Sequence, residues 1–185
     1  MGMPVPQPIS TIEELLALPE DGLRHELLDG EHIVTPTPRP AHERMVQELW
    51  FVLRSAIGER TDLEAFGARA DMRLGARTLV QPDVFVIQNP AAGRVRDWAE
   101  APIPLLAVEV LSPSTAARDR GSKRRWYLRA GVEEYWIVDL DARLVERWRQ
   151  GDERPEMVDG TLEWSLSVGL AGSLDLPRLF DRVGN

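Results

Sequence analysis

The chain has 185 residues, with 30 acidic and 22 basic side chains, a formal net charge of −8 and no cysteine. This composition excludes disulfides and thiolate zinc sites, and the negative charge argues against a general nucleic-acid binder. The length suggests one domain, and no apolar run approaches the roughly 18 residues that a membrane span needs. We therefore expect a protein of the reducing cytoplasm with no membrane contact.

The first residues predict an arm followed by a short helix and a hairpin. Residues 1–9 are proline-rich and are expected to be extended and flexible, with a single domain over 10–185. Ser10 and Glu13 suggest a capping box for a helix that ends before Pro19. Asp29-Gly30 lies between two short alternating runs, a pattern typical of a β-hairpin.

The rest of the chain alternates helical and strand patterns. The clearest helix spans residues 41–57, a basic helix spans roughly 118–130, and a last helical turn is expected near 177–180. The strand candidates are residues 63–74, 79–87, 103–111, 134–140, 144–148 and 162–167. This order predicts an α/β (α+β) domain with a central mixed β-sheet flanked by helices.

Two acids stand inside strongly apolar strand patterns. Glu109 lies in the run Leu105–Leu111, and Asp83 follows Pro82 at the start of Val84-Phe85-Val86-Ile87. A buried carboxylate costs several kcal/mol unless it is paired, hydrogen-bonded or bound to a metal. If the strands are neighbours, a divalent cation such as Mg²⁺ resolves the repulsion. The alternative is that each acid accepts backbone N–H bonds or pairs with an arginine.

Lys123 is the single lysine in a chain that otherwise uses arginine for positive charge. Its helical neighbours on the inward face are Trp126, Tyr127 and Ala130, so its ammonium should point toward the sheet near the end of the Glu109 strand. There it could orient a water or stabilise a pentavalent phosphate. The alternative is a lysine that snorkels from the edge of the core.

A basic stripe accompanies Lys123 on the same helix, opposed locally only by Asp119. It consists of Arg118, Arg120, Arg124, Arg125 and Arg129. Such a stripe suits contacts with nucleic-acid phosphates. It would equally suit a solvated helix face that balances acidic neighbours.

Several motifs together resemble a known family. HELLDGE, PDVFVI, LLAVEVLSPST, DRGSK and GVEEYWIVD are similar to segments of the Uma-two family of restriction-endonuclease-like proteins, within the PD-(D/E)XK nuclease superfamily. The resemblance covers about residues 10–150. It implies a restriction-endonuclease-like core and Mg²⁺-dependent phosphodiester cleavage, with Mn²⁺ as a possible substitute. It also implies that Asp83, Glu109 and the main-chain carbonyl of Val110 bind the metal.

The resemblance extends to other residues with one departure. The superfamily lysine usually lies two residues after the glutamate, where this chain has Leu111, so Lys123 would take its role from the following helix. Glu26 matches an acidic family residue and is a candidate third carboxylate, although it could be a simple hairpin charge. His42 could contact a scissile phosphate, or could serve as a helix cap.

Three functions fit these observations. The first is a metal-dependent endonuclease acting on nucleic acid, with DNA favoured, in which Asp83, Glu109, Lys123 and Glu26 are catalytic. The second is an inactive nuclease fold that binds DNA or protein, and the third is a hydrolase of small phosphate esters. A homodimer is expected because cutting two strands favours two sites. Trp136 and Trp148 could pack its interface, although both also suit the core.

Overall fold

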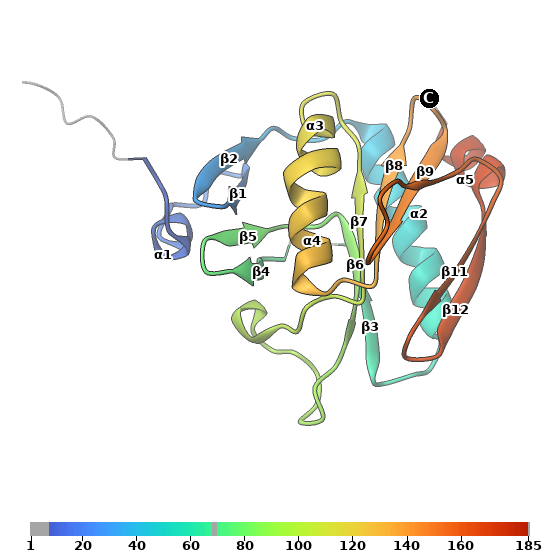
Figure 1. The fold of residues 1–185 in the computed structure, drawn as a ribbon, viewed down its shortest axis with the longest axis horizontal. Coiled ribbons are helices and arrows are strands. Elements are labelled where there is room, and N and C mark those ends of the chain that lie inside the picture. The colour runs from blue at the N-terminus through green and yellow to red at the C-terminus, as the bar shows by residue number, and fades with distance from the viewer. Residues whose placement is uncertain (1–7, 68–69, 185) are drawn as a thin grey trace, which may run out of the picture.

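The computed structural model describes residues 8–67 and 70–184, and in this part of the chain the strands form three sheets (Figure 1). The large sheet has the order β10-β9-β8-β7-β6-β3, in which β7 and β8 are parallel and the other pairs antiparallel. Its strands are β3 (Leu63–Phe66), β6 (Val84–Gln88), β7 (Leu106–Val110), β8 (Glu134–Asp139), β9 (Leu144–Arg149) and β10 (Glu156–Val158). The predicted mixed sheet is confirmed.

Helices cover both faces of this sheet, which explains why its central strands are apolar throughout. Because side chains alternate along a strand, one face of β6 and β7 packs on α2 (Pro40–Ile57) and the other on α4 (Arg124–Ala130). The residues on the α2 side are Val84, Val86, Leu106, Val108 and Val110. Those on the α4 side are Phe85, Ile87 and Ala107. Glu109 therefore faces α4.

The smaller sheet has the order β2-β1-β5-β4 and lies beside α4 (Figure 1). Its strands are β1 (Arg24–Leu28), β2 (Glu31–Thr35), β4 (Met72–Gly75) and β5 (Thr78–Val80). The predicted hairpin is confirmed, since β1 and β2 pair around Asp29 and Gly30 with positive φ angles of 55° and 84°. A side chain at Gly30 would also meet the guanidinium of Arg77.

The single strand expected over residues 79–87 is wrong. The chain leaves β5 in the small sheet at Val80 and enters β6 in the large sheet at Val84. Pro82 has no N–H for a ladder bond, so the strand breaks there. The strand expected over 63–74 is likewise two strands, β3 and β4, in different sheets. Asp83 consequently lies at the junction of the two sheets.

The basic helix is also not one regular α-helix. It consists of α3 (Ala116–Arg118), a π-helical segment η2 (Asp119–Lys123) and α4. In η2 the carbonyl of Asp119 accepts from the backbone N–H of Arg124 and from the hydroxyl of Tyr135. Wide turns of this kind occur frequently at functional sites. Here the turn brings Asp119 and Lys123 inward together, with 1% and 2% exposure.

The C-terminal region holds more structure than expected. Strand β10 lies in the segment between β9 and β11, where no strand was predicted. Strand β11 (Thr161–Leu166) pairs with a second strand that was not predicted, β12 (Leu170–Asp175), and α5 (Leu176–Val183) follows. Trp136 and Trp148 are 0% and 5% exposed within the chain, so they belong to the core and are not free to form a dimer interface.

The N-terminal region differs from the sequence prediction in two places. The capping box of α1 (Ile12–Leu16) is formed by Thr11 and Glu14, one residue later than expected. Most of the arm expected over 1–9 lies outside the described residues, but Ile9 packs against the apolar cluster around α1. Among the helices of the described ranges, none combines the length and apolar character needed to cross a bilayer.

Candidate active site

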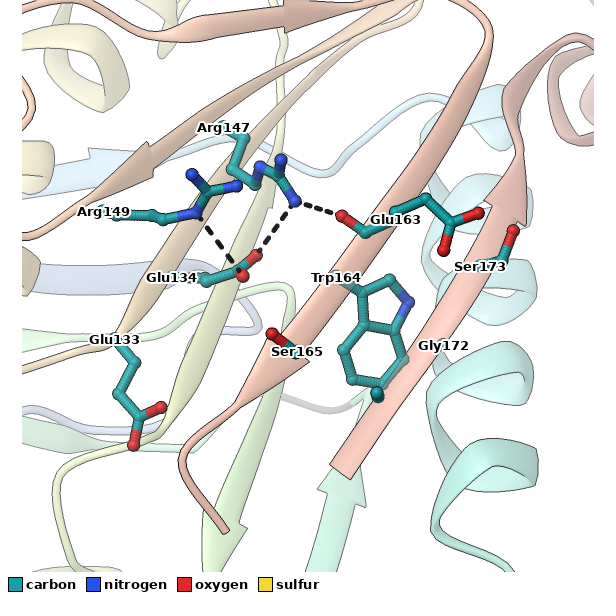
Figure 2. Close-up of a pocket in the computed structure, with 10 residues that line it drawn as sticks. Glu133, Glu134, Arg147, Arg149, Glu163, Trp164, Ser165, Gly172 and Ser173 are labelled. Carbon is teal, nitrogen blue, oxygen red and sulfur yellow. Dashed lines mark hydrogen bonds and ion pairs between the residues drawn. The ribbon is translucent and has the colours of Figure 1, made fainter. Parts of the chain in front are cut away.

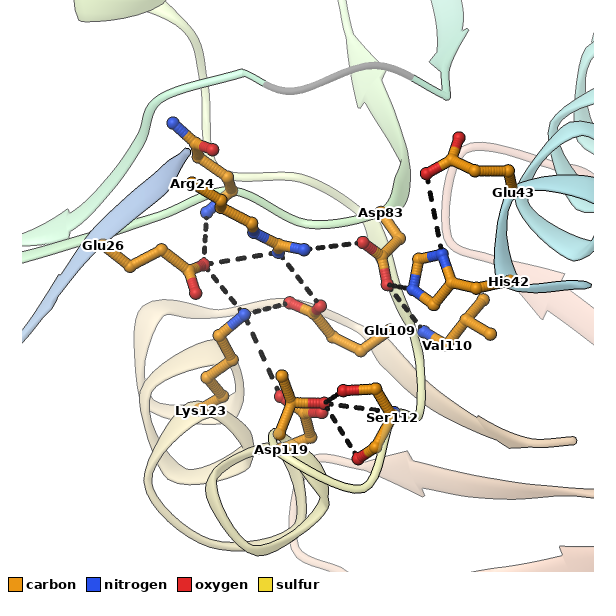
Figure 3. A network of polar contacts seen from close by, with 12 residues as sticks. Arg24, Glu26, His42, Glu43, Asp83, Glu109, Val110, Ser112, Asp119 and Lys123 are labelled. Carbon is orange, nitrogen blue, oxygen red and sulfur yellow. Dashed lines mark hydrogen bonds and ion pairs between the residues drawn. The ribbon is translucent and has the colours of Figure 1, made fainter. Parts of the chain in front are cut away.

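Glu109 lies at the centre of a buried polar cluster between the two sheets and the π-helical turn (Figure 3). Its Oε1 accepts hydrogen bonds from Lys123 Nζ at 2.9 Å and from the hydroxyl of Tyr127 at 2.8 Å. Strand alternation directs Glu109 toward α4, and the helical spacing of Lys123 directs the ammonium back toward it. The predicted inward orientation of Lys123 is confirmed.

Asp83 reaches the same cluster from the junction between β5 and β6. Its Oδ2 accepts the backbone N–H of Val110 at 2.8 Å and lies 3.2 Å from Nε2 of His42. Its Oδ1 accepts from Nη1 of Arg24 at 2.7 Å. Asp83 is therefore held by a backbone N–H and an arginine, which is the alternative to metal binding that the sequence left open.

Glu26 joins the cluster from β1, where it is 1% exposed. Its Oε1 lies 2.8 Å from Lys123 Nζ and accepts the backbone N–H of Gln81 at 2.7 Å. Glu26 is therefore a buried partner of the inward ammonium and not a simple hairpin charge. Asp119 completes the set of acids, with Oδ1 3.9 Å from the same ammonium.

Arg24 is the member of the cluster that sequence reasoning missed. Its guanidinium contacts three carboxylates, with Nη1 2.7 Å from Asp83 and Nη2 3.4 Å from Glu26 and 3.3 Å from Glu109. A signal was present in the sequence, because Arg24 and Glu26 are two residues apart on one strand and so share a face. Tyr127 was identified only as part of an apolar helix face.

Burial and the neighbouring charges push the pKa values of the acids apart. Burial raises the pKa of Glu109 to about 8, and the nearby Lys123 and Arg24 offset this only in part. Burial acts in the same direction on Asp83, but Arg24 and His42 hold its pKa well below the usual range. Burial would lower the pKa of Lys123, but Glu109 and Glu26 raise it, so the ammonium stays charged at neutral pH. Paired titratable groups whose pKa values diverge are typical of catalytic sites.

A cleft of about 1070 Å³ opens onto this cluster. Arg24, His42, Asp83 and Glu109 lie in its wall, together with the loop that follows β7. The Pro36–Pro40 segment and the N-terminus of α2, which carries His42, also line the cleft. Asp83, Glu109 and His42, three of the residues predicted from the sequence, thus line the cleft, whereas Lys123 and Glu26 do not.

The donor chemistry fits a hard divalent cation, whereas the present arrangement does not enclose one. Four carboxyl groups, those of Glu26, Asp83, Glu109 and Asp119, converge on this cluster, and a divalent ion would favour their ionised forms. Carboxylate oxygens are the ligands that Mg²⁺ prefers. Among residues 8–67 and 70–184, however, no group of three Asp, Glu, His or Cys side chains is arranged to hold an ion. Arg24 stands between Asp83 and Glu109, where such an ion would bind.

The basic stripe is less free than the sequence suggested. Arg120 pairs with Asp139 at 2.8 Å and Glu146 at 2.6 Å, so Asp119 is not its sole acidic neighbour. Arg124 stacks on Trp148, and Arg129 lies over Trp126. Within the described part of the chain, Arg118 and Arg125 form no ion pair, and they remain the candidates for phosphate contacts.

A second hollow, of about 820 Å³, lies between β9 and the β11–β12 hairpin (Figure 2). Its charges are paired internally, since Glu134 lies 4.0 Å from Arg147 and 3.8 Å from Arg149 and accepts the indole N–H of Trp136. None of the residues predicted from the sequence as catalytic lines this hollow, in contrast to the cleft at Glu109. The cleft at Glu109 is therefore the stronger candidate for the active site.

Comparison with known proteins identifies the family and the fold. A family model named Uma2 and described as "Putative restriction endonuclease" matches residues 12–177. The chain belongs to the Uma2 family. A crystal structure of a "putative nuclease belonging to DUF820" from Anabaena variabilis is similar over 94% of this chain and 99% of that one, with 23% identity and a TM-score of 0.77. It shows that this Uma2 protein has the same fold. A search of curated proteins found no match.

Proposed function

We propose that this Uma2 protein is a metal-dependent endonuclease that cleaves phosphodiester bonds of nucleic acid, with DNA as the favoured substrate. The observation that carries the proposal is the convergence of Asp83 and Glu109 on a cleft, with the buried ammonium of Lys123 2.9 Å from Glu109. The family and the nuclease fold support the same reaction class.

In the proposed site, Asp83, Glu109 and the carbonyl of Val110 would hold Mg²⁺, with Mn²⁺ able to substitute. A bound divalent ion would polarise the scissile phosphate and stabilise the leaving oxygen. Hard oxygen donors next to an open cleft suit such an ion, which keeps several waters and binds substrate phosphates.

Lys123 acts as a fixed charge in this proposal. Its raised pKa means that it cannot accept a proton from water at neutral pH. Glu26 and Glu109 hold the ammonium from two sides, at 2.8 and 2.9 Å. We assign it the orientation of the attacking water and stabilisation of the negative charge that develops on the phosphate. Glu26 is then a positioning residue for this ammonium.

His42 and the free arginines are proposed to contact the nucleic-acid backbone. His42 lies in the cleft beside Asp83, whose hydrogen bond raises the histidine pKa against the effect of burial. A histidine that is protonated more readily suits a phosphate neighbour. Arg118 and Arg125 would add contacts outside the cleft, and a homodimer would supply a second site for the other strand.

The test is cleavage of plasmid and single-stranded DNA by protein freed of metal with EDTA and then supplied with Mg²⁺ or Mn²⁺. We expect metal-dependent cleavage by the wild type and a loss of about 100-fold or more in Glu109→Gln and Lys123→Met. Arg178→Met, at an exposed arginine of α5 that does not line the cleft, is the matched control for protein quality. Equal cleavage by all four proteins would identify a contaminant and remove the proposal.

The second candidate is an inactive nuclease fold that binds DNA or protein. It is favoured by one observation, namely that Arg24 already fills the space between Asp83 and Glu109. It predicts salt-dependent DNA binding that EDTA does not change, and no cleavage with either ion.

A further inference from the structure

The guanidinium of Arg24 lies between Asp83 and Glu109, the two proposed metal ligands. One nitrogen of its guanidinium bonds Asp83 and the other contacts Glu109 and Glu26 (Figure 3). A forked, permanently charged group bridges two carboxylates well. It thus supplies, within the chain, part of the positive charge that a divalent ion would supply.

The two buried cations of the cluster are not held equally. Lys123 is 2% exposed and contacts Glu26 and Glu109 at 2.8 and 2.9 Å. The side chain of Arg24 is 11% exposed, and two of its three carboxylate contacts are longer, at 3.3 and 3.4 Å. Of the two, Arg24 is the cation that can leave.

The surroundings of Arg24 also provide a place for it to go. Arg24 lies in the wall of the cleft, so its long side chain can turn toward solvent without unfolding β1. Its Nε is buried and has no hydrogen-bond partner among the described residues, so its present position leaves one donor unsatisfied.

We propose that Arg24 is an internal competitor for the metal: its guanidinium closes the site in the metal-free protein and swings into the cleft when a divalent ion binds between Asp83 and Glu109. The inference rests on the proposed function, because it assumes that an ion binds these two acids. Its consequence is that Arg24 sets the ion concentration at which the enzyme becomes active. The apparent dissociation constant for the ion is the intrinsic one divided by the fraction of molecules with Arg24 displaced.

The test is calorimetric titration of the EDTA-treated full chain with Mn²⁺, with no nucleic acid present. We expect Arg24→Met to bind Mn²⁺ about tenfold or more tightly than the wild type. Arg24→Lys keeps the charge without the fork and should bind with intermediate affinity. Arg39→Met is the control for charge alone, because Arg39 is an exposed arginine of the same cleft with no ion pair in the described part of the chain. Its affinity should equal that of the wild type.

Thermal melts give a second readout that does not depend on activity. Arg24→Met should lower the melting temperature more in EDTA than in saturating Mn²⁺, because only the metal-free state uses the guanidinium. If Arg24→Met does not fold without metal, the melting temperatures of Arg24→Lys in EDTA and in Mn²⁺ are compared with those of the wild type instead.

The outcomes separate this inference from the proposed function. Equal Mn²⁺ affinity in the wild type, Arg24→Met and Arg24→Lys overturns the competitor role and leaves the metal-dependent nuclease intact. Tighter binding by Arg24→Met together with unchanged binding by Arg24→Lys assigns the effect to net charge and also overturns it. Absence of Mn²⁺ binding in all of these proteins overturns the inference and the metal site together.

Discussion

Replacing Lys123 with methionine perturbs the site most directly, because this ammonium joins three acids. Lys123 is 2% exposed and lies 2.8 Å from Glu26, 2.9 Å from Glu109 and 3.9 Å from Asp119. Methionine keeps a similar apolar length and removes the charge. Removal of one partner from a buried ion pair costs about 3–5 kcal/mol, because it leaves the other charge uncompensated.

That loss should be visible as a large fall in thermal stability. For a domain of this size, about 2–4 °C of melting temperature corresponds to each kcal/mol, so Lys123→Met should melt about 6–20 °C lower in EDTA near neutral pH. Calorimetry or circular dichroism measures the shift. Arg125→Met, on the exposed side of the adjoining helix α4, should melt within about 1–2 °C of the wild type.

A double variant distinguishes electrostatics from lost packing. Glu26→Gln in the Lys123→Met background removes one of the carboxylates that have lost their ammonium partner, so it should recover part of the lost stability. If Lys123→Met melts like the wild type, or if the second substitution lowers stability further by its full single-variant effect, the ammonium is not the charge that compensates these acids.

Three further predictions concern other parts of the chain. The raised pKa values of Glu109, about 8, and of His42 mean that the folded metal-free protein binds these protons more tightly than the unfolded chain. Its stability should therefore fall as the pH rises from about 5 to about 8, by at most about 1.4 kcal/mol per pH unit for each group, and Glu109→Gln should flatten melts recorded across this range. Arg118→Met should reduce the salt dependence of DNA binding by about one phosphate contact, a change of about 0.9 in the log–log slope measured by fluorescence anisotropy, and an unchanged slope would remove Arg118 from the interface. Gly172→Ala would place a Cβ 2.6 Å from the facing indole ring, so it should cost about 1–3 kcal/mol in urea unfolding, whereas Gly160→Ala, with nothing within 4 Å, should cost far less.

The centre of the site could be predicted because its residues are anomalous in their local sequence. An acid inside the apolar run of β7 needs a partner, and helical spacing is enough to turn Lys123 toward it. Arg24 was missed for the opposite reason. It stands at the first position of β1, next to exposed residues, where a charge is ordinary. The approach of Asp83 and Glu109, from distant parts of the chain, makes it unusual.

The fold shows the same division between local and long-range causes. The hairpin at Asp29-Gly30 and helix α2 are encoded by turn chemistry and by the 3.6-residue period. By contrast, β12 contains Ala171-Gly172-Ser173, which has little strand propensity, and it forms because β11 pairs with it along six residues. The break at Pro82 was visible in the sequence, but the separation of β5 and β6 into two sheets depends on partners such as β1 and β7.

The most direct test of the account is diffraction from crystals soaked in Mn²⁺, with anomalous data to locate the ion. The account predicts a peak between Asp83 and Glu109 at about 2.0–2.2 Å from their oxygens, with the guanidinium of Arg24 moved into the cleft and Lys123 still bonded to Glu26. Saturating Mn²⁺ that leaves no peak there, with Arg24 still bridging the two acids, would contradict the metal-dependent site.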